Sequence, residues 1–466
     1  MSVSAKPNAG KWGLLGGALS RDVLSREALS RRAALLAPLA LAGCETIDGW
    51  FGTKKTPLTG KREAVLTARR GVTVDEGTRK IVLPPPVRNA GWPQAGGNPA
   101  HVMGHLAVND GLSRAWASDI GTGGGYRRKI LAQPVVDGGM VFAMDSNGVV
   151  SAFSLKDGAR SWRFDTRNEE ADSDNIGGGL AADNGTVYAA NGLGDMMALD
   201  AVKGTVRWRK MLTAPARSAP TVAEGRLFIT TIEDRLLALA SDDGRALWNH
   251  RGAGAGTALL GQPAPAYARG LVVAGFGSGE VAAMRADTGS VLWTDGLGSA
   301  ASLRSGLVDF TAIRGAPVIA GGIVYAVGMG GLTAAIDLPT GRRIWERQIG
   351  GEDTVCVAGD WVFMVSLEQE MVAIDATDGR IAWVSPLPRW ANEEKRKDPL
   401  TWYGPVLAGD RLVVTGNSEE ALSISPYTGA ILGRQALSGA ASPVTPIVAD
   451  GTLLVVSDDA RLLALR

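Results

Sequence analysis

Short apolar runs, separated by turns rich in glycine and aspartate, fill most of the chain after residue 110. Between Gln133 and Phe164, four such runs follow one another: QPVV, MVFAM, VVSAF and RSWRF. They are rich in the β-branched and aromatic residues that strands favour, and similar sets start at Pro317 and Gly404. No segment of this part keeps a helical period over about ten residues. The pattern predicts an all-β protein with four strands in each repeat.

A local motif marks the last turn of each repeat. An apolar strand ends in Asp or a substitute, a turn ends in Gly, and Trp follows four residues after that Gly. Successive tryptophans of the motif lie 38 to 52 residues apart, a spacing typical of propeller blades and other repeat arrays. A seventh copy has Gly433 where Trp is expected, and an isolated strand carries Trp116, 46 residues before Trp162. These positions predict eight outer strands.

The chain supplies the eighth repeat in two pieces. Three runs, PVTPIV, TLLVVS and RLLALR, follow Gly433 without a fourth strand, and the strand around Trp116 lacks a repeat of its own. We therefore predict an eight-bladed β-propeller of four antiparallel strands per blade, with its last blade closed by the N-terminal strand. Each indole would dock on the next blade, and Gly433 would mark a weak seam between blades seven and eight. The expected docking residues are Trp116, Trp162, Trp208, Trp248, Trp293, Trp345 and Trp383.

The N-terminal residues have the pattern of an export signal. Four arginines precede an uncharged stretch, residues 33–43, which is too short to span a bilayer. The sequence Leu-Ala-Gly-Cys ending at Cys44 matches a bacterial lipobox, so we expect acylation of Cys44; an ordinary signal peptide with a chance cysteine is the alternative. Arg31 and Arg32 leave the export route open between the general and twin-arginine systems. The expected organisation is a signal peptide (1–43), a lipid-anchored flexible tether (44–109) and the propeller (110–466).

Composition and motifs exclude several other functions. The net charge is +1, which gives no electrostatic reason to expect nucleic-acid binding. The glycine-rich stretches 121–126 and 252–261 lack a following helix, so they do not predict a dinucleotide site. His101 and His105 are four residues apart without a third ligand nearby, and the acidic segment 168–175 lacks the spacing of a calcium loop, so no metal or cofactor is expected. Cys356 lies in an apolar run and is expected to be buried and inert. The charged insertion 386–405 reads as a solvated loop or as a contact for a substrate or partner.

The repeated Asp-x-x-(Thr or Asp)-Gly-x-x-x-Trp motif resembles the tryptophan-docking motif of PQQ-like propellers, and with the lipobox it resembles the BamB family. That resemblance implies a non-catalytic scaffold lipoprotein of the outer-membrane β-barrel assembly complex. It implies docking on BamA, contact with other assembly subunits, and assistance to unfolded outer-membrane proteins. The expected place is the periplasmic face of the outer membrane, with Glu45 in place of an inner-membrane retention Asp.

The resemblance also implies a docking surface on two loops. The family pattern Leu-x-Leu-Arg-Gly falls on residues 257–261, where Leu259 and Gly261 match and Leu260 replaces the Arg. The second loop has Ala312 and Arg314 where the family has acids. These five residues are the expected partner contacts, although Leu259 and Leu260 could equally begin a buried inner strand.

Two other functions remain open from the residues. A PQQ-dependent dehydrogenase shares the docking motif, but the chain lacks the adjacent cysteine pair common in those enzymes. A lipoprotein that binds cell-wall polysaccharide through rim aromatics is the second alternative. A dye-reduction assay with PQQ and calcium tests the first, and sugar-dependent pull-down tests the second.

Overall fold

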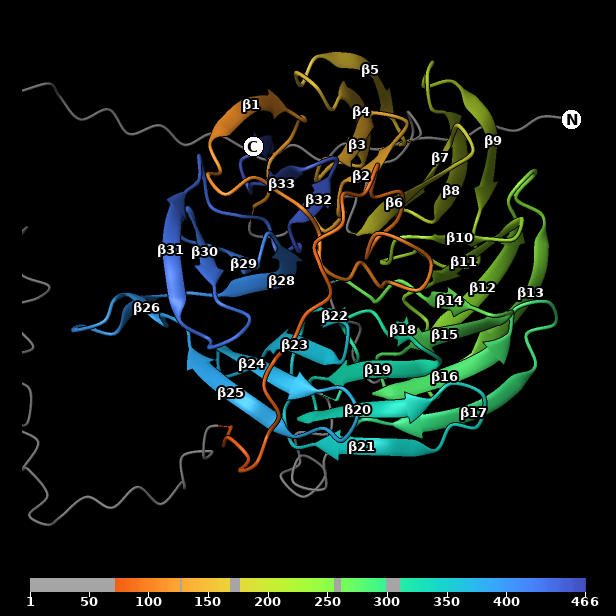
Figure 1. Ribbon diagram of the computed structural model, residues 1–466. Coiled ribbons are helices and arrows are strands. Elements are labelled where there is room, and N and C mark those ends of the chain that lie inside the picture. The colour runs from red at the N-terminus through yellow and green to blue at the C-terminus, as the bar shows by residue number, and fades with distance from the viewer. Residues whose placement is uncertain (1–71, 126–127, 168–176, 255–260, 299–310) are drawn as a thin grey trace, which may run out of the picture. The chain divides into compact units, whose positions relative to one another are not determined.

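The computed structural model describes residues 72–125, 128–167, 177–254, 261–298 and 311–466. These residues form 34 strands, arranged as eight four-stranded sheets and one two-stranded sheet. None of them lies in a helix, and hence none in a helix able to span a membrane. The eight sheets follow one another around a centre as the blades of a propeller (Figure 1), which confirms the predicted fold class.

Each blade is an antiparallel meander that runs from the innermost to the outermost strand. Blade 1 contains β2 (Val135–Asp137), β3 (Met140–Met144), β4 (Val149–Ser154) and β5 (Arg160–Asp165), and blade 2 contains β6 (Gly178–Asp183), β7 (Thr186–Asn191), β8 (Asp195–Asp200) and β9 (Val206–Met211). Blade 3 contains β10 (Thr221–Ala223), β11 (Arg226–Thr230), β12 (Arg235–Ala240) and β13 (Ala246–Arg251), and blade 4 contains β14 (Ala266–Ala268), β15 (Leu271–Gly275), β16 (Glu280–Arg285) and β17 (Val291–Gly296).

The remaining blades follow the same plan, except that blade 8 takes its outer strand from the start of the described chain. Blade 5 contains β18 (Val318–Ala320), β19 (Ile323–Gly328), β20 (Leu332–Asp337) and β21 (Arg343–Arg347), and blade 6 contains β22 (Cys356–Ala358), β23 (Trp361–Val365), β24 (Glu370–Asp375) and β25 (Ile381–Pro386). Blade 7 contains β28 (Trp402–Ala408), β29 (Arg411–Gly416), β30 (Glu420–Ile424) and β31 (Ile431–Ala436), and blade 8 contains β32 (Ile447–Ala449), β33 (Thr452–Val456), β34 (Arg461–Leu465) and β1 (Arg114–Asp119).

The first and last described strands, β1 and β34, close the ring within blade 8. Strand β1 pairs antiparallel with β34, with Trp116 opposite Ala464 and Asp119 opposite Arg461. Beyond the strands, the backbones of Ser113 and Arg466 exchange two further hydrogen bonds of 2.8 and 2.9 Å. The closure predicted from the unpaired strand around Trp116 is therefore confirmed.

The hydrophobic core is divided among the seams between blades. One buried cluster joins Val273 and Val281 of blade 4 to Val324 and Ile336 of blade 5, and similar clusters fill the other seams. Because middle strands are apolar on both faces, each sheet needs a neighbour on either side. This requirement explains why the repeats form a closed ring.

Seven seams share one indole contact. Each docking tryptophan donates its Nε1–H to a backbone carbonyl in the next blade, over 2.7 to 3.1 Å. The indole also covers the turn glycine of that blade. For example, a Cβ added to Gly379, whose φ is +76°, would lie 2.8 Å from Trp345. The motif's glycine therefore provides both a left-handed turn and a flat surface for the preceding tryptophan.

The eighth seam lacks this contact for a topological reason. In the other blades the indole meets the turn between the third and fourth strands, but in blade 8 that turn is replaced by the ends of β34 and β1. Gly433 on β31 faces this gap, and no atom lies within 4 Å of where its Cβ would be. The missing tryptophan thus coincides with the missing turn.

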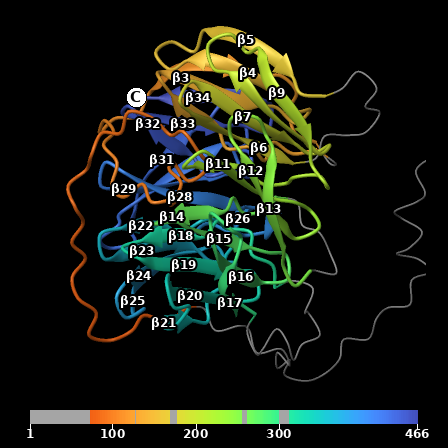
Figure 2. The same ribbon diagram turned by 90° about the vertical axis from the view of Figure 1, so that its right-hand side faces the viewer.

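Residues 72–109, which we expected to belong to the flexible tether, lie instead along one face of the ring (Figures 1 and 2). We call this segment the N-terminal strap. Trp92 exchanges two backbone hydrogen bonds of 2.8 Å with Val136 of blade 1. The side-chain amide of Gln94 donates to the carbonyl of Val222 of blade 3 and accepts from its N–H. Further bonds join the strap to blade 2 (Ala182), blade 4 (Tyr267), blade 5 (Ile319), blade 7 (Leu407) and blade 8 (Val448). Trp92, His101 and Leu106 are buried, so the strap is part of the folded domain.

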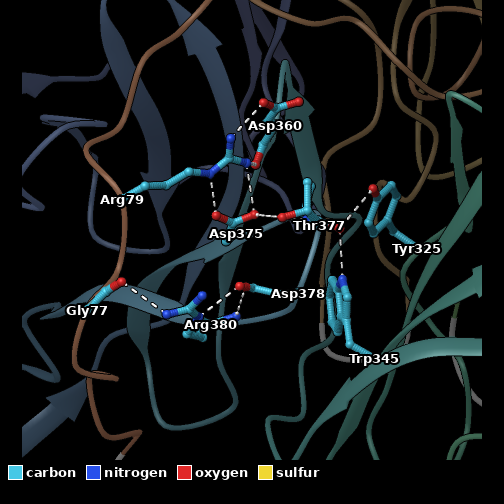
Figure 3. Close-up of polar contacts among 10 residues, drawn as sticks. Gly77, Arg79, Tyr325, Trp345, Asp360, Asp375, Thr377, Asp378 and Arg380 are labelled. Carbon is cyan, nitrogen blue, oxygen red and sulfur yellow. Dashed lines mark hydrogen bonds and ion pairs between the residues drawn. The ribbon is translucent and has the colours of Figure 1, made fainter.

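The outer part of the strap is fixed to blade 6 by Arg79 (Figure 3). Its guanidinium contacts the carboxylates of Asp375 and Asp360 and lies 5.5 Å from the ring centre of Trp361. Nearby, the backbone N–H of Asp75 donates to the carbonyl of Ile381, the first residue of β25. With this anchor the strap contacts all eight blades.

Candidate functional site

The centre of the ring contains a cavity of about 170 Å³. Every blade contributes residues to its wall, mainly from the segments that lead into the innermost strands, and the strap contributes Trp92, His101 and Met103. The backbone hydrogen bonds that the strap makes at Trp92, Pro93, Pro99 and Ala100 lie on innermost strands, whereas most of the other wall residues precede those strands. The strap therefore covers the end of the cavity that faces the first turn of each blade.

Two of the predicted partner contacts lie together in this wall. An added Cβ on Gly261, whose φ is +79°, would lie 4.0 Å from Nε of Arg314, so the two loops meet between blades 4 and 5. Ala312 is different, because it is only 1% exposed and its carbonyl accepts the N–H of Met329. Its side chain is therefore not presented to a partner. Leu259 and Leu260 lie outside the described residues.

Charged side chains converge beside Arg314. Arg314 forms an ion pair with Glu352, and the neighbouring Asp353 accepts a hydrogen bond of 3.1 Å from the backbone N–H of Gly404. Burial raises the pKa of Asp353 to about 6, and the opposing charge of Arg314 only partly offsets that effect. Burial, reinforced by the charge of Asp353, also raises the pKa of Tyr403 to about 12. This cluster joins blades 5, 6 and 7, and its members Arg314, Glu352 and Asp353 line the cavity.

Cys356 also lines the cavity, at the start of β22. We expected a buried and inert thiol, and the residue is half-buried in the described structure. Burial raises the pKa of the thiol to about 12, so it stays protonated at neutral pH and is a poor nucleophile. Cys44, the expected lipidation site, lies outside the described residues.

The two strap histidines are held by the backbone. Nδ1 of His101 lies 2.7 Å from the carbonyl of Pro317, and Nδ1 of His105 lies 2.8 Å from that of Pro84. Both Nδ1 atoms must donate, and Nε2 of His105 accepts from the N–H of Asp410. Within the described ranges, no group of three or more His, Cys, Asp or Glu side chains could hold a metal ion. The acidic segment 168–175 falls outside those ranges.

The charged insertion contains a small hairpin beyond the ring, formed by β26 (Trp390–Asn392) and β27 (Lys397–Pro399). Residues 391–399 are all exposed. The base of this hairpin is held by Trp402, which is 1% exposed and donates its Nε1–H to the carbonyl of Pro388. The two tryptophans of the insertion thus have different roles, because Trp402 is a core residue and Trp390 is only half-buried.

Sequence reasoning missed Glu352, Asp353 and the strap contacts. The only local sign of the acidic pair was two adjacent acids before the apolar run of β22. Nothing in the local sequence shows that Arg314, 38 residues earlier, would pair with Glu352. Their meeting depends on the radial arrangement of blades 5 and 6.

Comparison with known proteins assigns the family. A family model described as "Outer membrane protein assembly factor BamB" matches residues 93–175, 169–385 and 388–466. The outer membrane protein assembly factor BamB of Yersinia pestis is 27% identical over 353 residues, covering 74% of this chain and 86% of its own length.

Two solved structures share the fold. The crystal structure of BamB from Moraxella catarrhalis has a TM-score of 0.65 at 20% identity, covering 76% of this chain and all of that one. A quinohemoprotein alcohol dehydrogenase from Pseudomonas putida has a TM-score of 0.63 at 14% identity, covering 81% of this chain and 80% of that one. At these identities the likeness shows the propeller fold alone. The family model spans almost the whole ring, and the chain therefore belongs to the BamB family of PQQ-like propellers.

Proposed function

We propose that this protein is a non-catalytic scaffold of the outer-membrane β-barrel assembly machinery. The observation that carries this proposal is the match of the BamB family model to nearly all of the propeller. The relatives are named as outer membrane protein assembly factors. In this role the protein would be held at the periplasmic face of the outer membrane by a lipid on Cys44. It would dock on BamA beside other subunits and assist unfolded outer-membrane proteins.

The proposed docking surface is the loop region around Leu259, Leu260, Gly261 and Arg314. Support comes from the packing of Gly261 beside Arg314 in two loops that are distant in sequence. Arg314 is 21% exposed, and it stands where the family pattern has an acid. A partner of this chain would therefore need a compensating acid, since an Arg opposite a basic partner surface would repel it.

Co-purification with BamA from detergent-solubilised envelopes tests both statements. We expect replacement of Leu259 and Leu260 by Ser, or Arg314→Glu, to reduce recovery of BamA at least tenfold without lowering the melting temperature by more than a few degrees. Arg434→Glu is the matched control, because Arg434 forms a similar Arg–Glu pair on the outer strand of blade 7. Full recovery of BamA with both loop variants would exclude this surface, and absence of BamA with the unmodified chain would exclude the proposed function.

A further inference from the structure

Among the residues that the structure describes, none donates a charged hydrogen bond to the carboxylate of Asp353, which lines the axial cavity. Arg314 points its guanidinium to Glu352, whereas the hydrogen bond that Asp353 accepts comes from the backbone N–H of Gly404. Asp353 is partly buried in the cavity wall, and a carboxylate that is shielded from bulk water usually pairs with a cation or takes up a proton, because desolvation penalises the charged form. A positively charged guest in the cavity would therefore stabilise the ionised carboxylate of Asp353.

The groups around Asp353 define its electrostatic environment. Arg314, from the segment before blade 5, attracts the carboxylate, and Glu352, beside it in the chain, repels it. Tyr403 of β28 faces the same group, and its high pKa keeps the phenol neutral at physiological pH. Arg217 of blade 3 also lines the cavity, but its charge is not among those that shift Asp353.

The size and lining of the cavity restrict the guest. Its volume of about 170 Å³ is close to that of a cavity of roughly 150 Å³ that holds benzene in another protein. Met103, Pro263 and Val444 provide apolar wall around the polar cluster. A short alkyl chain that ends in a cationic group fits both the volume and this division between apolar and acidic lining.

We propose that the axial cavity binds an organic cation, an alkylammonium or alkylguanidinium group the size of a lysine or arginine side-chain end, with Asp353 as its counter-ion. This site goes beyond the scaffold role, and its test needs no partner protein. Glu352 has a supporting role, because it occupies Arg314 and so leaves Asp353 for the guest. The strap covers one end of the cavity, so the guest would enter from the opposite end.

Binding should depend on pH with a defined sign. The carboxyl of Asp353 is ionised above a pKa of about 6, and only the ionised form attracts a cation. Its ionised fraction rises about tenfold from pH 5 to pH 7, so the affinity for the guest should rise about tenfold over the same range. Conversely, a bound cation should lower the pKa of Asp353.

Titration of the full chain with propylguanidinium, and with propylurea as its neutral isostere, tests this site. We expect calorimetry to detect propylguanidinium, propylurea to bind at least tenfold more weakly, and Asp353→Asn to abolish the difference. Asn keeps an oxygen for the N–H of Gly404, and Glu233→Gln, at an exposed acid of blade 3, is the matched control. Glu352→Gln should also weaken binding, because it releases Arg314 to pair with Asp353.

A second measurement uses the unmodified protein, so its result does not depend on whether the variants fold. In the unmodified protein, the ¹³Cγ resonance of Asp353 should titrate with a pKa near 6, and saturating propylguanidinium should lower that pKa by about one unit. Equal binding of propylurea, unchanged affinity in Asp353→Asn, or an Asp353 pKa that does not respond would overturn the proposal. Displacement of the probe by calcium chloride, with the same fall in pKa, would assign the site to a metal and overturn it as well.

Discussion

Arg79 and Asp375, 296 positions apart, are joined by two hydrogen bonds from one guanidinium to the two oxygens of one carboxylate. Burial by itself would raise the pKa of Asp375, but the bonds from Arg79 and Thr377 outweigh it and lower the pKa below the usual value. The Asp375 side chain is 5% exposed, so loss of Arg79 would leave a nearly buried charge with fewer donors. This pair attaches the outer strap to blade 6.

Arg79→Ala should therefore destabilise the protein by about 1–2 kcal/mol, because a charged hydrogen-bond donor to a buried acceptor is lost. Amide exchange in residues 72–81 should also become faster, as measured by mass spectrometry. Arg88→Ala removes another strap ion pair, with Asp450, in which both side chains are more than half exposed. We expect a cost below about 0.5 kcal/mol there. Equal costs for the two variants would show that Arg79 has no special anchoring role.

The burial of His101 should make the strap sensitive to acid. Burial lowers the pKa of His101 from 6.5 to about 4, so the folded state favours the neutral imidazole. The unfolded chain then binds more protons between those two values, and stability should fall as the pH drops from about 6.5 to 4. The shift corresponds to a loss of about 3 kcal/mol.

Urea unfolding at pH 7 and pH 4.5, compared between the unmodified chain and His101→Asn, measures this contribution. Asn keeps a donor near the carbonyl of Pro317 and removes the titration. The variant should therefore be less stable at pH 7 but lose less stability on acidification. A parallel pH dependence of the two proteins would contradict the assignment.

Two alanine substitutions at turn glycines separate the energetic cost of a clash with the docked tryptophan from the cost of backbone strain. Gly379 and Gly225 have nearly equal φ values, +76° and +72°, but only Gly379 has an indole against the place of its Cβ. Alanine at either position costs about 1 kcal/mol through the backbone, and the contact with Trp345 should add about 1–3 kcal/mol at Gly379. Thermal melting of Gly379→Ala and Gly225→Ala measures the difference. Equal melting temperatures would show that the indole moves away at no cost.

Removal of residues 461–466 should have the largest effect. Strand β34 lies between β33 and β1, so its loss leaves β1 without a partner strand and β33 paired with β32 alone, and it opens the ring. We expect loss of cooperative unfolding or a fall of more than about 10 °C in the melting temperature. Arg466→Ala, which keeps β34 and removes side-chain bonds to blade 1 and to Thr452 of β33, is the milder control. An unchanged melting temperature in the shortened chain would contradict closure by β34.

The fold could be predicted because its signal is local and repeated. Gly379 and Trp383 are four residues apart in a motif that recurs along the sequence, and the absence of a fourth strand after Gly433 indicated the closure by β1. The strap could not be predicted in this way. Its prolines, glycines and charges are typical of linkers, and its order comes from backbone bonds to distant strands and from single buried residues such as Trp92 and Leu106.

The candidate site was only partly predictable for a related reason. Gly261 and Arg314 could be placed through a family pattern, because each stands beside a recognisable short motif. Asp353 and Tyr403 carry no such sign, since their shared environment is created by neighbouring blades at the centre of the ring. Radial symmetry brings together residues that are one blade length apart, and local periodicity does not report on that contact.

The order of strands in blade 8 has a consequence for biosynthesis. Because β1 precedes and β34 follows the other described strands, a chain made from its N-terminus onward remains an open arc until β34 has been synthesised. During that time the apolar faces of blades 1 and 7 have no neighbour to cover them. Such an arc would be a natural substrate for chaperones, and the final fold would be reached only after translation of the closing strand.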